Sequence, residues 1–112
     1  MKRIRLLTSL LLIAAPAFAA DPDAGLAAIQ DLGRVNGQAL ACGEMAFSGK
    51  AKALMIRHAP KIRRYGELFE EATNAAFLTQ GKDTDGCPKA VEFSARLAEL
   101  GGRLQATLPA AQ

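Results

Sequence analysis

The sequence has few of the residues from which active sites are built. Its 112 residues include one histidine, two cysteines and no tryptophan. No tight cluster of carboxylates is present, so a nucleophile activated by a base, or a pair of catalytic acids, has few candidates. Asp83 and Asp85 are close together, but their loop lacks the further oxygen ligands of a calcium loop. We therefore expect a protein that is not an enzyme and that has no cofactor or bound metal.

The N-terminus has the pattern of a secretory signal peptide. Lys2, Arg3 and Arg5 precede a short apolar run, which ends in small residues around Ala19. This pattern predicts cleavage after Ala19, with residues 1–19 as the signal peptide and residues 20–112 as one mature domain. The run is shorter than the ~20 residues of a membrane-spanning helix, and no second run of that length follows. We expect export to a bacterial periplasm, with no transmembrane segment in the mature chain.

The excess of positive charge belongs to this signal peptide. The chain has 14 basic and 11 acidic residues, and three of the basic residues lie before residue 6. The mature chain is therefore balanced, which gives no overall electrostatic attraction to nucleic acid. Export would also separate the protein from the nucleic acids of the cytoplasm, and the sequence has no stacking aromatic motif or zinc motif. We expect no binding to nucleic acid.

The two cysteines, Cys42 and Cys87, are expected to form a structural disulfide. An oxidising compartment favours the bond, and a small domain has a marginal core that a covalent link would stabilise. For a loop of this length, the chain-entropy model gives about 4 kcal/mol. The sequence has no C-x-x-C spacing and no histidine next to either cysteine. A redox-active pair or a metal pair is therefore disfavoured.

Hydrophobic periodicity is helical through the mature chain, and no stretch shows the alternation of a strand. The pattern predicts helices over about 24–43, 49–59 and 60–80, followed by one that begins near Pro88. Pro60 separates the second helix from the third. The fourth helix has the clearest apolar stripe, made by Phe93, Leu97, Leu100, Leu104 and Leu108. The predicted fold is all-α: a small three-to-four-helix bundle stapled by one disulfide.

A run of basic residues is the most distinctive feature of the mature chain. Residues 50–64 hold six lysines and arginines and no acidic residue. Such a surface can receive a protein or an anionic component of the cell envelope. The alternative is a solvated face on which Arg63 pairs with Glu67. The residues predicted to bind the partner are Lys50, Lys52, Arg57, Lys61 and Arg64.

His58 is predicted to lie on the inward face of its helix. With Met55 one turn before it, and with Met45 as a third donor, it has the ligand types of a soft copper site. The alternative is a buried neutral histidine that is hydrogen-bonded to a backbone carbonyl. A small-ligand or copper carrier using His58 and Met55 is therefore a second candidate function.

The first predicted helix carries two further features. Gly33 and Gly37, one turn apart, form a groove that another backbone can approach, either within the chain or in a homodimer. Asn36 falls within the apolar arc of the same helix, where a polar amide must find hydrogen-bond partners. Those partners are either the backbone of a neighbouring loop or a bound ligand.

An exported small helical domain with two cysteines about 45 residues apart resembles the periplasmic acid-stress chaperones in architecture. This resemblance implies a third candidate function, a chaperone that loosens in acid. Our leading hypothesis is a non-catalytic periplasmic protein that binds a protein or envelope partner through its basic residues.

Overall fold

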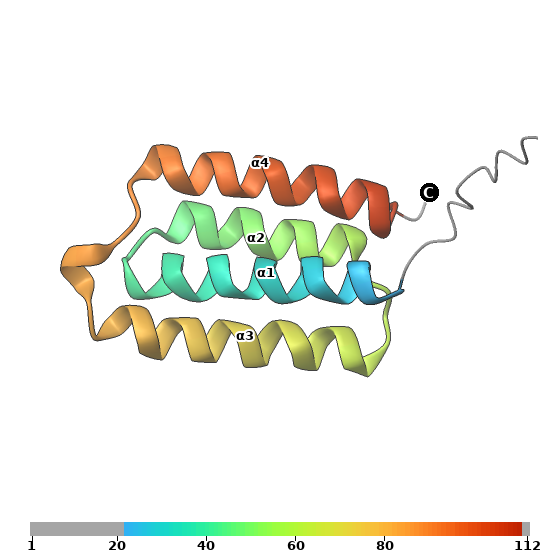
Figure 1. Ribbon diagram of the computed structural model, residues 1–112, viewed down its shortest axis with the longest axis horizontal. Helices are drawn as coiled ribbons and strands as arrows, with labels where there is room; N and C mark the ends of the chain where they lie inside the picture. The colour runs from blue at the N-terminus through green and yellow to red at the C-terminus, as the bar shows by residue number, and fades with distance from the viewer. Residues whose placement is uncertain (1–21, 111–112) are drawn as a thin grey trace, which may run out of the picture.

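The computed structural model describes residues 22–110, and the predicted signal peptide lies outside this range. Four α-helices and one 3₁₀ turn make up the described chain, which contains no strand (Figure 1). No helix in residues 22–110 is long and apolar enough to span a membrane. The all-helical prediction is therefore confirmed for this range. The elements are α1 (Pro22–Ala41), α2 (Met45–His58), α3 (Arg63–Gly81), η1 (Thr84–Gly86) and α4 (Ala90–Thr107).

Two helix starts differ by three or more residues from the sequence prediction because of local turn chemistry. Gly43 has φ 72°, and the amide of Glu44 donates to the carbonyl of Ala39 across 2.8 Å. This is the Schellman end of a helix, and it reverses the chain sharply enough for α2 to begin at Met45 instead of near residue 49. In contrast, α3 begins three residues later than expected, because the backbone of Ile62 is still extended.

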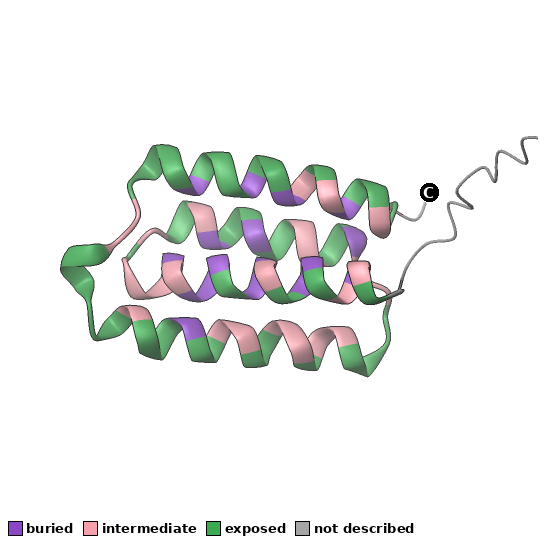
Figure 2. Ribbon diagram, in the orientation of Figure 1, coloured by how far each residue is buried: buried purple, intermediate pink, exposed green. Residues whose placement is uncertain are grey.

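The core lies between α1, α2 and α4, and α1 packs against all three other helices. Figure 2 shows the buried residues on the facing sides of these helices. Phe93 of α4 is completely buried, and its ring stacks on that of Phe47 with centroids 5.3 Å apart. Four of the five residues of the predicted α4 stripe are buried, and the fifth, Leu108, packs against the core from just beyond the helix. The remaining buried apolar residues of this core are Ala28, Ile29, Leu32, Val35, Ala39 and Ala51.

The α3 helix packs on the opposite side of α1 from α4, along the predicted glycine groove (Figure 1). A Cβ atom on Gly33 would lie 2.5 Å from the carbonyl oxygen of Phe69. A Cβ atom on Gly37 would lie 2.9 Å from that of Ala76, and closer still to the carbonyl oxygen of Thr73. The groove is therefore filled within one chain, and a homodimer through these glycines is not supported.

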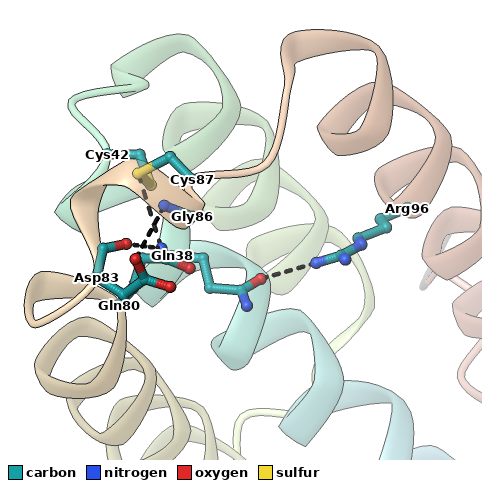
Figure 3. Close-up of a disulfide and its surroundings, with 7 residues drawn as sticks. All are labelled: Gln38, Cys42, Gln80, Asp83, Gly86, Cys87 and Arg96. Carbon is teal, nitrogen blue, oxygen red and sulfur yellow. Dashed lines mark hydrogen bonds between the residues drawn. A yellow bond between two sulfur atoms is a disulfide. The ribbon is translucent and has the colours of Figure 1, made fainter.

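The predicted disulfide is present and joins the end of α1 to the segment that precedes α4 (Figure 3). Cys42 and Cys87 have Cα atoms 5.9 Å apart. The loop beside the bond is held by its own polar groups: Gln80 Nε2 donates to the carbonyl oxygen of Asp83 across 2.8 Å. The carboxylate of Asp83 in turn accepts from the amide of Gly86 across 3.0 Å. The disulfide therefore links the end of α1 to the short loop that connects α3 with α4.

Candidate functional site

The predicted partner-binding residues are all exposed, but they do not form one face. Successive residues of a helix are about 100° apart, so Lys52 lies roughly 140 to 160° around α2 from Lys50 and Arg57. Lys50 and Arg57 border a groove between α2 and α4, whereas Lys52 borders a groove between α2 and α3. Lys61 borders the continuation of the latter, and Arg64 is exposed at the start of α3. The structure therefore divides the basic run between two flanks of α2.

The groove between α2 and α4 has a volume of about 440 Å³ and is open to solvent. Its floor includes Leu54 and Leu97, and the two cations at its border both come from α2. The ammonium of Lys50 lies 5.4 Å from the centre of the Phe47 ring, a cation–π contact that engages this side chain within its own helix. This flank therefore offers a charged border over an apolar floor.

The groove between α2 and α3, called here the α2–α3 groove, is longer. It exists because α2 and α3 each pack against α1 with little direct contact between them. Leu40 of α1, Met55 of α2 and Phe69 of α3 supply its apolar surface. It continues past the end of α2 along Met55, Ile56 and residues 59–63. Its volume beside α2 is about 450 Å³, and it is open to solvent along its length.

Two large aliphatic side chains are exposed at this groove. Ile56 on α2 is 81% exposed, and Ile62 in the connection to α3 is 61% exposed. Lys52 and Lys61 lie beside them in the groove lining. Arg63 follows Ile62, and its Nε lies 3.9 Å from a carboxylate oxygen of Glu67, so the predicted pair forms only a weak exposed contact. The groove therefore combines unburied apolar surface with positive charge.

A buried polar network lies beneath the α2–α3 groove and joins its three helices. Asn36 of α1, only 1% exposed, accepts a hydrogen bond from the hydroxyl of Ser48 on α2 across 2.7 Å. Its Nδ2 donates to Thr73 Oγ1 on α3 across 3.2 Å. Thr73 in turn donates to the carbonyl oxygen of Gly33 across 3.2 Å. Asn36 is thus partnered by side chains of two helices, and the expected loop backbone takes no part.

The partners of Asn36 were not found from the sequence. Ser48 lies three residues before Ala51 and seven before Met55, a spacing that places it on the inward side of α2. This placement requires the helix to begin before residue 48, and α2 begins at Met45. Within residues 22–110, no buried side-chain nitrogen or oxygen lacks a hydrogen-bond partner. The amide of Asn36 therefore has a structural role in holding the walls of the groove.

His58 is buried as predicted, at the C-terminal end of α2. Its Nδ1 lies 2.8 Å from the carbonyl oxygen of Leu108. A carbonyl only accepts, so this nitrogen is the protonated one and the bond ties the ends of α2 and α4 together. Met55 is one turn away, but Met45 is thirteen residues from His58, about 20 Å along the helix. The three predicted copper donors are therefore not brought together.

The remaining charged residues are dispersed over the surface. In the described range, no three histidine, cysteine or acidic side chains are close enough to share a metal ion. Asp31 of α1 accepts from Arg103 of α4 across 2.8 Å and from Arg34 across 3.0 Å. Arg96 of α4 donates to Gln38 of α1 across 2.9 Å (Figure 3). These contacts hold α4 against α1, so we assign these charged side chains a structural role.

Comparison with protein-family models, with curated proteins and with solved structures finds no match to this chain. The choice among candidate functions therefore rests on the geometry above.

Proposed function

We propose that this is an exported, non-catalytic protein that binds a protein or an anionic component of the cell envelope through the basic residues of α2 and of the α2–α3 connection. The observation that carries the proposal is the exposure of Ile56 and Ile62 among Lys52, Lys61 and Arg63. Aliphatic side chains gathered in one exposed place, and surrounded by charge, are typical of interaction surfaces.

The chemistry of the described residues favours binding over catalysis. Both cysteines are in the disulfide, and His58 is occupied by a hydrogen bond that holds two helices together. Residues 52–64 carry five exposed lysines and arginines and no acidic residue, and they produce a positive local potential. The predicted mature chain as a whole has equal numbers of basic and acidic residues. Such a potential speeds the encounter with an anionic surface and is weakened by salt.

The proposal is tested by cross-linking and affinity capture of the mature protein from an envelope extract, at low and at high salt. We expect a specific partner that is retained at low salt and lost at high salt. Charge reversal at Lys52, Arg57 and Lys61 should abolish the capture. A control variant reverses Lys82 and Lys89, two exposed lysines near the disulfide end of the molecule.

Two outcomes would contradict the proposal. If the triple charge reversal left every captured component unchanged, the basic residues would be a solvated surface. If nothing specific were captured under any condition, a small-ligand function would become the better hypothesis.

A further inference from the structure

We propose that the α2–α3 groove binds an amphipathic helix of a partner protein whose apolar stripe is flanked by acidic residues. The inference rests on the proposed function, because it specifies the chemistry of the partner and where it binds. The bound helix would pack against α1, α2 and α3 together, in a position that no helix of the described chain occupies.

The shape of the groove favours a helix. Its two walls are helices that pack on α1 and leave α1 accessible between them at Leu40. Its apolar residues come from three different helices, so a partner must insert side chains to reach them. An amphipathic helix does this with residues spaced at i, i+3, i+4 and i+7. A flat membrane surface would meet the protruding Ile56 but would not follow the groove inward to Leu40 and Phe69.

The charge of the groove favours acidic flanks on the bound helix. Lys52, Lys61 and Arg63 line the groove and its continuation, against one acidic residue, Glu70. The carboxylate of Glu67, outside this lining, contacts Arg63 only at 3.9 Å, and the guanidinium remains almost fully exposed. Three cations against one carboxylate give an attractive field for acidic residues and a repulsive one for basic residues.

The network beneath the groove makes its walls rigid before any partner arrives. Ser48 is fixed to Asn36 on the α2 side, and Thr73 is fixed to Asn36 and Gly33 on the α3 side. A preformed groove loses little conformational entropy on binding, which favours affinity. The buried polar network therefore gains a role in recognition, because it fixes the walls of the groove, and Asn36 and Thr73 are themselves part of the groove lining.

The test uses the disulfide-bonded protein and a panel of labelled synthetic peptides. Each peptide is long enough for about five helical turns and has a stripe of leucine, isoleucine or phenylalanine with glutamate on both sides. Control peptides replace glutamate by lysine, or scramble the order so that the stripe is lost. We expect at least one acidic amphipathic peptide to bind saturably and to gain helicity, and we expect the controls to bind about tenfold more weakly or worse.

Substitutions in the protein locate the site. Ile56→Glu and Lys52→Glu should each weaken peptide binding by about tenfold, because they remove burial and reverse the local charge. The controls are Val91→Glu on α4 and Lys89→Glu at its N-cap, which make the same types of change at exposed positions, and they should bind as the wild type does. All four positions are exposed, so circular dichroism should show the same helix content in every variant.

Three results would overturn the inference: no peptide binds, acidic and basic peptides bind alike, or the Ile56 and Lys52 variants bind like wild type. Binding to phosphatidylglycerol vesicles without binding to any peptide would assign the surface to lipid instead. A failure here is distinguishable from failure of the proposed function. If capture from the envelope extract persists and depends on Lys50 and Arg57 alone, the function stands and the α2–α3 groove is not its site.

Discussion

Replacing Gly37 by alanine tests the packing of α3 on α1 most directly. The new methyl group would meet the backbone of α3 at the carbonyl of Thr73, and it would lie 2.8 Å from the amide nitrogen of Phe77. Backbone atoms cannot move aside by changing a rotamer. The two helices must therefore separate, and Thr73, which hydrogen-bonds to Asn36 and Gly33, must move with α3.

The expected effect is the difference between two terms. Alanine in place of glycine stabilises a helix interior by about 1 kcal/mol. Overpacking a close contact costs about 1 to 3 kcal/mol, and we expect the upper end because the clash involves backbone. The net loss is then about 2 kcal/mol, which would lower the melting temperature of a domain this small by about 8 to 16 °C.

Gly102→Ala is the matched control. Gly102 lies within α4 and has open space around the position of a new Cβ atom. The same chemical change should therefore stabilise the protein by up to about 1 kcal/mol. Both variants are to be measured by urea and thermal unfolding, followed by circular dichroism at a helix band. If Gly37→Ala stabilised the protein as Gly102→Ala is expected to do, the described contact between α1 and α3 would be wrong.

Three further outcomes are expected. Reduction of the disulfide should lower the free energy of unfolding by up to about 4 kcal/mol, measured by urea titration with and without reductant; no change on reduction would contradict this. Ser48→Ala should cost about 1 to 3 kcal/mol, because it leaves the amide oxygen of Asn36 unpaired, whereas the exposed Ser94→Ala should change stability by less than about 0.5 kcal/mol. Titration with Cu(I) should give the same affinity for the wild type and for His58→Ala, since His58 is held by the carbonyl of Leu108; a clear loss in the variant would restore the copper hypothesis.

The helices and their core were predictable because burial and periodicity point the same way. Ile29 and Leu32 lie at helical spacing in α1, as do Phe93 and Leu104 in α4, and all four side chains are completely buried. The disulfide was predictable for a simpler reason, since the chain has two cysteines and each is the only candidate for the other. The helices follow from a local pattern of apolar residues, and the disulfide follows from the presence of just two cysteines. Predicting them does not require knowledge of how the helices are placed relative to one another.

The site was less predictable because it depends on how the helices are rotated and where they begin. Lys50 and Lys52 are neighbours in sequence, yet they border different grooves. Asn36 was identified as a buried amide in need of partners, but the choice of Ser48 and Thr73 follows from tertiary packing. The exposed aliphatic surface at Ile56 was not foreseen, because a helical pattern alone does not show which side remains uncovered.

The disulfide also turns residues 42–87 into a closed covalent ring that contains both α2 and α3. The exposed connection at Lys61 and Ile62 lies near the middle of that ring, with Ile62 20 residues after Cys42 and 25 residues before Cys87. A protease that cut there would place α2 and α3, the two walls of the groove, in different fragments. The two fragments would remain joined through the disulfide between Cys42 and Cys87. On a gel without reductant the cut protein would migrate as one species, and with reductant as two.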